Sequence, residues 1–454
     1  MAIKIDPGTL NVVLIGIGFL FLFSANNTAV SIEAMVVSSV NTEFGLDWEG
    51  NSWDAFSALS IYMLIFGIGN LIAPMMIEIL GPKMSVLISG ISIWASNLLF
   101  IIPFKSGLIL NSLIGGFFGA IVWTGQGTIL AVNSDASNIT LNSSLFWIIY
   151  QLNRVIGNGF IMFEFDGVEV IETETRVKTF LLLMTCASFG LLSMSFIKDV
   201  KSKNEDAPVR KASPIQAMKS MATLAKSKEM MLISVMSFYL GIVIPYYSGI
   251  YGTAIGFTRE LGTDRKKYSG EAGIIFGIGE IIGCCVLLGI PSKYSSQIYC
   301  KKIVMFIGYL FHMFSFVASY FNLPAHSSWG ETDEAAIMHT SLGLALTVSF
   351  MLGVGDAFIQ AQIWTLLSSY YKGQSSAAFA IFLLVECMSA AATFFYSNFV
   401  DMHGHSYILI ITGTLGIIAI LKAYSMMQQE KKEDEESNKK DVNFNLETYS
   451  SSVI

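Results

Sequence analysis

Four ionisable residues lie inside otherwise apolar stretches of the chain: Arg154, Glu280, Asp356 and Glu386. A charge at the centre of a membrane-spanning helix costs roughly 2.5–3.5 kcal/mol on the insertion scale, so it is seldom kept without a partner or a water-filled cavity. In a transporter built from two six-helix halves, the fifth and eighth helices meet where the halves join. Because Arg154 and Glu280 lie near the middle of these helices, we predict an ion pair between them.

The predicted pair has two interpretations. It is either a static lock, with Arg154 alternatively capping backbone carbonyls, or an ion pair that breaks as the halves rock. Asp356 follows a Gly-Val-Gly segment whose small residues permit close helix approach. Asp356 and Glu386 are candidates for proton coupling. The alternative for either carboxyl is a neutral group that hydrogen-bonds a neighbouring helix.

Polar residues on helices 1, 4, 7 and 10 would line a central cavity in this architecture. The segment Trp123-Thr-Gly-Gln126-Gly opens a groove beside the glutamine and offers an indole face for stacking. A hydrogen bond between packed helices is the simpler explanation for any one of these residues. The predicted cavity set is Asn26, Asn27, Trp123, Gln126, Tyr246, Tyr247, Asp356, Gln360 and Gln362.

Long apolar segments must position these residues. The chain of 454 residues is 53% hydrophobic and 13% charged, against about 25% charged in ordinary soluble domains. In lipid each segment must satisfy its own backbone hydrogen bonds, so helices are forced. We predict an all-α membrane protein of twelve transmembrane helices in two six-helix halves. The spans are Leu10–Val30, Ala55–Leu80, Met84–Phe104, Gly107–Val132, Leu145–Met162, Thr179–Ile197, Met230–Ile255, Gly273–Ile290, Ile303–Phe321, Ala336–Leu367, Ala377–Tyr396 and Tyr407–Met427.

A five-residue repeat supports the division into halves. Ile-Phe-Gly-Ile-Gly occurs at residues 65–69 and 275–279, inside the second helix of each half. The predicted organisation is an N-terminal half at 1–197, a linker at 198–228, a C-terminal half at 229–427 and a tail at 428–454. An alternative for the first span is a signal peptide, because Lys4 precedes its apolar run. Cleavage would leave eleven helices and break the symmetry.

The linker and the tail carry two weaker signals. Ser213-Pro214 resembles a helix N-cap and first-turn proline, and apolar residues follow it at three-residue spacing as far as Leu224. This pattern predicts a short amphipathic helix on the membrane surface, serving either as a plain linker or as a partner-binding helix. The charged tail is predicted to be disordered. It ends Ser452-Val453-Ile454, a form of C-terminus that PDZ-domain proteins capture.

The distribution of basic residues predicts the orientation. Nineteen of the 27 Lys and Arg residues would lie on the side of both termini. The positive-inside rule therefore predicts cytoplasmic termini, in the plasma membrane or an endomembrane. The cluster from Arg259 to Lys267 opposes the rule. Either Glu260 and Asp264 balance it, or the predicted boundaries there are wrong.

Several kinds of chemistry are not expected. The five cysteines and five histidines do not cluster, so neither a disulfide nor a tetrahedral metal site is predicted. The sequence holds no phosphate-binding loop and no nucleophile–base arrangement. We therefore expect no enzyme activity, no cofactor and no nucleic-acid partner.

Two stretches are specific enough to indicate a family. Residues 120–127 are followed by Asn133-Ser134 and by 142–147, and residues 248–253 are followed by 273–280 and 378–382. These segments resemble Unc-93-like proteins, and the similarity spans nearly the whole membrane region. The resemblance implies a twelve-helix major facilitator fold. Members of this family include a regulatory subunit of a potassium channel complex and an escort of nucleic-acid-sensing receptors.

Two functions follow from the resemblance. The first is a regulatory or trafficking partner of an ion channel, of the potassium channel class, or of a receptor, which the chain would contact through its lipid-facing helices. The second is a secondary-active transporter that moves an unidentified small solute by alternating access. Gly81-Pro82-Lys83 lacks the acidic residue and the arginines of the superfamily's loop signature, which favours the first.

Overall fold

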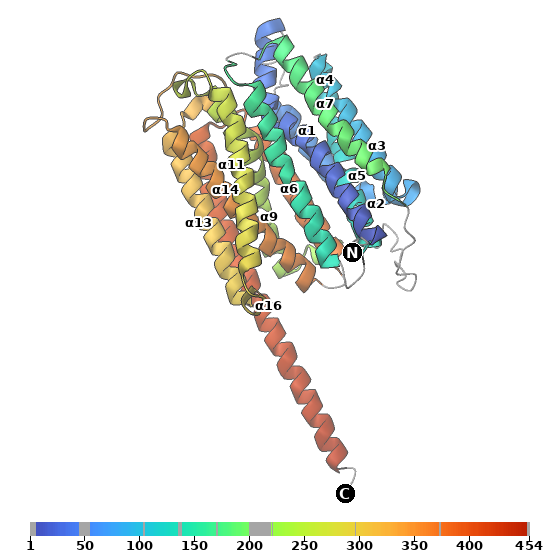
Figure 1. Ribbon diagram of the computed structural model, residues 1–454. Helices are drawn as coiled ribbons and strands as arrows, with labels where there is room; N and C mark the ends of the chain where they lie inside the picture. Colours follow the sequence, from blue (N-terminus) through green and yellow to red (C-terminus); the bar gives the residue numbers. More distant parts are fainter. Residues whose placement is uncertain are drawn as a thin grey trace.

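The structure is a computed structural model, and it describes residues 6–44, 55–102, 105–134, 139–168, 171–198, 219, 221–295, 297–371 and 374–451. These residues form two bundles of long helices that lie side by side (Figure 1). The described ends of the chain lie at the same end of the molecule, which we call the terminal end. We call the opposite end the distal end.

The N-terminal half is formed by α1 to α7, which are blue to green in Figure 1. Its short helix α4 extends α3 by one turn. The helices are α1 (Pro7–Phe44), α2 (Ala55–Leu80), α3 (Pro82–Ser96), α4 (Leu98–Ile101), α5 (Lys105–Val132), α6 (Ile139–Glu164) and α7 (Thr173–Ser195).

The C-terminal half is formed by the elements from α9 to α16, and short η segments join or extend its long helices. The elements are α9 (Lys228–Pro245), η2 (Tyr246–Ile250), α10 (Tyr251–Phe257), η3 (Arg259–Leu261), α11 (Arg265–Gly289), α12 (Ser292–Ser295), α13 (Ile298–Asn322), η4 (Ala325–Ser328), α14 (Leu342–Tyr370), α15 (Ser375–Tyr396) and α16 (Met402–Ser451).

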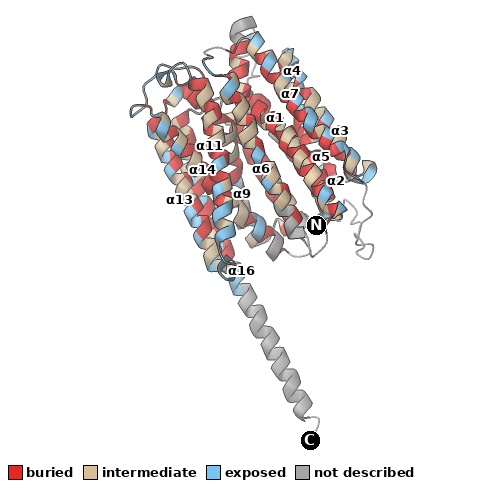
Figure 2. Ribbon diagram, viewed as in Figure 1, coloured by how far each residue is buried: buried red, intermediate tan, exposed pale blue. Residues whose placement is uncertain are grey.

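Within the described residues, eleven helices are long and apolar enough to cross a membrane. The remaining predicted span, Leu145–Met162, corresponds to α6, which is less apolar because it carries Asn153, Arg154 and Asn158. Figure 2 shows buried residues on the faces that the helices turn toward one another and exposed residues along the periphery. Each half has its own apolar core, and each lends residues to the other: Phe56 of α2 joins the C-terminal core, and Phe257 of α10 joins the N-terminal core.

Two predicted boundaries and the predicted disorder of the tail differ from the structure. The first span was expected to end at Val30, but α1 continues to Phe44 because apolar residues resume after Glu33. The tenth span was expected from Ala336, but the segment before Leu342 is a distal loop. The tail was expected to be disordered, yet α16 continues to Ser451. Glu, Lys and Gln in this tail are good helix formers. Extending an existing helix also avoids the unfavourable nucleation step.

Two other predictions fall largely on residues that the structure does not describe. The linker helix was predicted from Ser213, and only residue 219 and residues from Met221 onward are described there. Met221–Leu224 are helical, and Leu224 is buried. The C-terminal Ser452-Val453-Ile454 lies outside the described residues.

The seventh helix is interrupted at its middle. α9 ends at Pro245, and the five residues of η2 form a π-helical segment before α10 resumes the α-helix. Proline lacks a backbone N–H and its ring crowds the preceding turn, so the regular hydrogen-bond ladder is disturbed at this point. Single π-helical turns occur frequently at functional sites.

The repeated segment explains how α2 and α11 pack. In α2, a Cβ added at Gly67 would meet Cys387 of α15 in the other half, and one added at Gly69 would meet Ala120 of α5 in the same half. In α11, Gly277 faces Arg154 of α6 in the other half, and Gly279 faces the Phe350 backbone of α14 in the same half. The first glycine of each copy therefore permits contact between the halves, and the second permits contact within one half.

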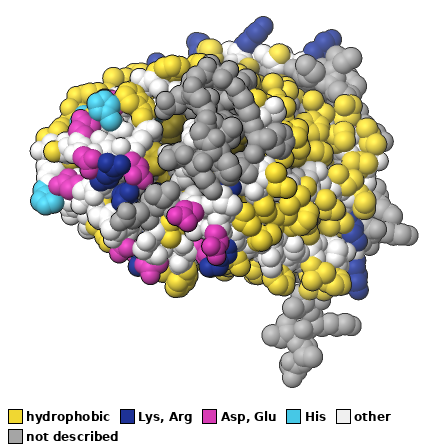
Figure 3. Space-filling view, turned by 90° about the horizontal axis from the view of Figure 1, so that it is seen from above, with side chains coloured by type: hydrophobic (Ala, Val, Ile, Leu, Met, Phe, Trp, Pro, Cys, Tyr) yellow, Lys and Arg dark blue, Asp and Glu magenta, His cyan; other side chains and the backbone are white. Residues whose placement is uncertain are grey.

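The basic cluster at the distal end is paired with acidic residues. Glu331 Oε2 lies 3.0 Å from Arg265 Nη2 and 3.4 Å from Arg259 Nε, and Glu331 Oε1 lies 3.0 Å from Lys266 Nζ. Lys267 Nζ lies 2.6 Å from Asp166 Oδ1 of the N-terminal half. Figure 3 shows acidic, basic and histidine side chains gathered at this end. The positive charge of this cluster was expected to be balanced by Glu260 and Asp264, but acidic residues of other loops mainly balance it. Proximity in the sequence does not reveal these partners.

Close packing at Gly279 gives the first prediction. A Cβ at this position would overlap the Phe350 carbonyl oxygen, so Gly279→Ala must push α11 away from α14. We expect a loss of about 1–3 kcal/mol, the usual effect of overpacking. Thermal unfolding of purified protein in detergent measures it. Gly127→Ala is the matched control, because nothing lies within 4 Å of the added Cβ. Equal stability of the two variants would contradict this packing.

The distal cluster gives the second prediction. Burial raises the pKa of Glu331, but the hydrogen bond and charge of Lys266 and the charge of Arg265 outweigh burial and hold the pKa below its ordinary value. The stabilisation of the folded state by ionised Glu331 is fully present above the pKa of an unfolded glutamate, about 4.3. It is lost as pH falls through the lower pKa of Glu331 in the folded state. Glu331→Gln should cost about 1–3 kcal/mol at neutral pH, because it leaves buried cations without this partner.

The control for Glu331→Gln is Asp333→Asn. The Asp333 side chain is 75% exposed in its pair with Arg259, so its loss should change stability little. Unfolding curves at pH 7 and pH 4 compare the two variants. An Asp333 effect as large as that of Glu331, or a Glu331 effect that grows on acidification, would contradict the expectation.

Candidate functional site

An ion pair joins the two halves at mid-height. Arg154 Nε of α6 lies 2.8 Å from Glu280 Oε2 of α11, and the side chains are 22% and 6% exposed. The predicted contact is therefore present. The N–H is not well aligned on the oxygen, so the contact is ionic rather than a strong directional hydrogen bond. Gly277 makes it possible, because α6 approaches α11 over this glycine one turn from Glu280.

Two aromatic rings cover the guanidinium. The Arg154 Cζ atom lies 4.8 Å from the centre of the Phe276 ring and 5.3 Å from that of Tyr247, and the two ring centres are 4.4 Å apart. Tyr247 belongs to the π-helical segment η2. Cation–π contacts contribute about 0.5–2 kcal/mol, more where water is excluded. The site therefore holds a cation between a carboxylate and aromatic faces.

Two more carboxylates lie near the pair. Asp356 of α14 and Glu386 of α15 are buried, and Asp356 interacts electrostatically with Glu280, Arg154 and Glu386. One oxygen of each, Asp356 Oδ1 and Glu386 Oε1, has no hydrogen-bond partner among the described residues. Of the four ionisable residues that the sequence singled out, Glu280 and Asp356 thus interact with the Arg154 cation, and Glu386 interacts with Asp356.

A small cavity lies on the distal side of this cluster. The space that the centre of a water molecule can occupy there is about 30 Å³. This is enough for one or two waters. Arg154 and Tyr247 form part of its wall, together with Ser31, Tyr251 and Ser349. The lining residues come from α1, α6, η2, α10, α11 and α14, so the cavity lies between the halves.

The halves also touch above and below the ion pair. At the distal end, Met35 of α1 packs on Gly256 of α10, where an added Cβ would lie 2.6 Å from the sulfur atom. Toward the terminal end, the rings of Trp147 on α6 and Trp364 on α14 are 5.8 Å apart. The polar cluster lies between these two apolar contacts, so it has no wide opening to either end at these points.

The predicted asparagines of α1 are divided between two places. The Asn27 amide donates to Asn153 Oδ1 at 2.9 Å and ties α1 to α6. Asn26 lines a different cavity inside the N-terminal half. Its assignment to the central cavity was wrong, because neighbouring residues on an α-helix point about 100° apart.

The predicted residues of α5 have separate environments. Trp123 packs among the rings of Phe19, Phe23 and Tyr150 and stacks on Trp147, which touches Trp364 of the other half. It therefore belongs to the aromatic contact between the halves. Gln126 is buried and is not part of the wall of the cavity beside Arg154.

Two of the remaining predicted residues lie outside the site. The Tyr246 ring packs on Tyr251 and on Phe316 of α13, inside the C-terminal core. Gln362 lies where α14 meets α16, and its backbone carbonyl accepts from Tyr424 Oη at 3.3 Å. Gln360, about 200° around the helix from Gln362, lies within hydrogen-bonding reach of Glu386.

Sequence reasoning missed two features of this region. One is the π-helical segment, for which Pro245 was the available signal. The other is Glu33, which the sequence placed beyond the end of the first span but which is 2% exposed within α1. An acidic residue that is followed by Ala-Met-Val-Val is the signal that could have kept it inside the helix.

The chain is similar to a known family and to curated proteins. Residues 50–421 match the family described as "Ion channel regulatory protein UNC-93". The curated "UNC93-like protein MFSD11" of Xenopus laevis is 33% identical over 429 residues, covering 90% of this chain and 94% of that protein.

Solved structures of transporters share the fold. The structure of the nucleoside transporter NupG superimposes with a TM-score of 0.64 at 12% identity, covering 92% of this chain and 98% of that one. A POT family transporter in complex with 5-aminolevulinic acid gives 0.66 at 12% identity, covering 91% of this chain and 96% of that one. The twelve-helix major facilitator fold predicted from the sequence is thereby confirmed.

The ion pair gives a double-mutant test. Arg154→Gln leaves the buried carboxylates of Glu280 and Asp356 without their cation, and Glu280→Gln leaves the cation with weaker partners, so each single variant should lose about 3–5 kcal/mol. The double variant should be more stable than the sum of the two losses predicts, because neither charge is left without its partner. Thermal unfolding of the four proteins measures the coupling. Strict additivity would show that the two residues do not act as a pair.

Proposed function

The chain belongs to the UNC-93 family, and we propose that this member is a secondary-active transporter that moves a small polar solute between its two halves. The sequence alone favoured a regulatory partner of a channel or receptor. The geometry of the buried charges between the halves instead favours a transporter over a regulatory partner.

The observation that carries the proposal is the buried charge at the interface between the halves. Arg154 has one close carboxylate partner, while Asp356 and Glu386 each keep an oxygen without a hydrogen bond among the described residues. A static helix contact has no need of further buried carboxylates near its ion pair, and charged groups within membrane segments commonly mark substrate and proton paths. A regulator that binds through its lipid-facing surface has no use for this arrangement.

The cluster suits alternating access. α6 and α11 approach each other over glycines, so small shifts between the halves meet little side-chain bulk. When the halves rock, the contact between Met35 and Gly256 opens at one end, and the contact between Trp147 and Trp364 opens at the other. Protonation of Asp356 or Glu386 would lower the electrostatic cost of parting Arg154 from Glu280.

The lining of the cavity limits the class of solute. The cavity beside Arg154 is lined by this arginine, whose guanidinium two aromatic rings cover, and by several hydroxyl-bearing residues. Such a site suits a small solute with an anionic or hydrogen-bond-accepting group and a flat or apolar part. The cavity of about 30 Å³ must widen to admit it, as the proposed rocking of the halves would allow.

A second function is favoured by the family's own description as an ion channel regulatory protein. In that role the chain would bind a channel through its lipid-facing helices, and the central cluster would only fix the relative position of the halves. Affinity purification from the native membrane, together with uptake of labelled small polar solutes by reconstituted protein, separates the two functions. Saturable uptake by the purified chain alone supports transport.

Alternating access is tested without knowing the solute. In a cysteine-free background, spin labels at Glu174 and Met338 report the distal distance between the halves, and labels at Met84 and Tyr299 report the terminal distance. All four side chains lie on the surface. The double variant Arg154→Gln/Glu280→Gln should populate a second state in which one distance lengthens while the other shortens. Double electron–electron resonance measures both distributions.

The matched control is a pair within one half. Labels at Ile102 and Glu174 both lie at the distal end of the N-terminal half, so their distance should stay constant while the distances between halves change. Distances between the halves that are unchanged by the variant would favour the static lock and the regulatory function. A change in the control pair would indicate local unfolding rather than rocking.

A further inference from the structure

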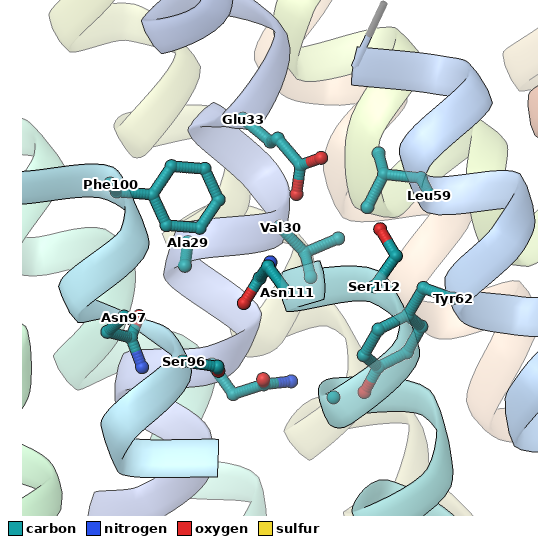
Figure 4. A pocket seen from close by; sticks show the side chains of 12 residues that line it. Ala29, Val30, Glu33, Leu59, Tyr62, Ser96, Asn97, Phe100, Asn111 and Ser112 are labelled. Carbon is teal, nitrogen blue, oxygen red and sulfur yellow. The ribbon is translucent and has the colours of Figure 1, made fainter. Parts of the chain in front are cut away.

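A second polar cavity lies inside the N-terminal half, away from the ion pair. It is enclosed by α1, α2, α5 and the junction of α3 with α4 (Figure 4). Its volume for the centre of a water molecule is about 10 Å³, which is room for about one water-sized particle. The site proposed for transport does not use this cavity.

Glu33 is the acidic group of this cavity. Its carboxylate points into the space near Asn111 and Ser112 in Figure 4. The residue is 2% exposed, and its Oε1 atom has no hydrogen-bond partner among the described residues. None of the described residues that line the cavity is basic. An ionised carboxylate in such surroundings costs several kcal/mol unless a positive charge accompanies it.

The neutral groups around Glu33 present oxygen atoms. Ser96 Oγ donates to the Ile93 carbonyl at 2.8 Å, and Ser112 Oγ donates to the Leu108 carbonyl at 3.1 Å. The Asn97 amide donates to the Ile93 carbonyl at 3.0 Å. Because both hydroxyl hydrogens are already used within their own helices, lone pairs remain for the cavity. Carboxylate, carbonyl and hydroxyl oxygens are the ligands that hard cations prefer.

We propose that this cavity binds one small monovalent cation of the alkali class, with Glu33 as its charged ligand and the oxygens of Ser112, Asn97 and Asn111 as neutral ligands. Sequence criteria for metal sites look for clustered cysteine, histidine and acidic residues, so a site with one carboxylate and neutral oxygens does not match them. The inference goes beyond the proposed function and stands without it, because cation binding does not require that any solute moves.

The position of α1 links this site to the interface between the halves. Asn26, Val30 and Glu33 face the cavity in the N-terminal half, while Ser31 faces the cavity beside Arg154. Met35, two residues beyond Glu33, packs on Gly256 of the other half. A cation that fixes α1 against α2 and α5 would therefore also favour one arrangement of the distal contact.

The test measures thermal unfolding of the full-length protein in detergent at constant pH and ionic strength, in sodium, lithium, potassium or choline chloride. Choline is too large for the cavity. We expect sodium or lithium to raise the unfolding temperature by about 2 °C or more over choline in the wild type, because a ligand that binds only the folded state stabilises it. Glu33→Gln should abolish the shift.

Two further variants keep the test decisive. Ser112→Ala removes one neutral ligand and should raise the sodium concentration for half-maximal stabilisation severalfold, even if Glu33→Gln does not fold. Glu174→Gln, an exposed glutamate of α7, should leave the shift intact. A wild-type protein that is equally stable in sodium, lithium, potassium and choline overturns the proposal, as does a shift that survives Glu33→Gln. If the series is repeated at a second pH, an unfolding temperature that changes with pH but not with the salt would overturn the proposal in favour of a protonated Glu33 carboxyl.

Discussion

Close packing of α2 and α11 against two neighbours at once is the constraint on which the rest of the structure depends. Each helix must contact the opposite half on one side and its own half on the other, and both contacts bring helices nearer than an ordinary side chain allows. Ile-Phe-Gly-Ile-Gly meets this demand twice, because its two glycines are two positions apart and face opposite sides. Within a bilayer such approach is a main source of helix association, since lipid is as apolar as the side chains it replaces.

The two copies of this arrangement differ in charge, and the difference defines the site. Gly277 admits Arg154, and the residue that follows the repeat is Glu280, so one contact between the halves is ionic. In the other copy, Gly67 faces Cys387 and the corresponding residue is Asn70, so that contact is neutral. Breaking the ionic contact requires compensation of charge, whereas the neutral one needs only sliding. A symmetric scaffold thereby has an ionic contact between its halves at mid-height where the other copy of the repeat has a neutral one.

Charges in this protein fall into two groups. At the distal end, Arg259, Arg265 and Lys266 share Glu331, and Lys267 contacts Asp166 of the other half. These pairs neutralise the basic cluster at the distal end. Within the bundle, Glu33, Asp356 and Glu386 keep carboxylate oxygens without partners among the described residues. Pairing is favoured wherever geometry permits it, so the unpaired groups are the ones that point to a bound proton, cation or solute.

The sequence by itself determined the membrane class, the two six-helix halves and the contact between Arg154 and Glu280, because hydropathy sets the spans and a buried charge demands a partner. It did not place Asn26, Tyr246 or Gln362 correctly, because the side of a helix that a residue faces depends on helix rotation and on the π-helical turn after Pro245. It missed Glu33 for a related reason: the length of a helix near one acidic residue depends on what packs around that residue. Tertiary structure alone decided which polar residues share a cavity, because residues far apart in the chain meet only when the helices pack.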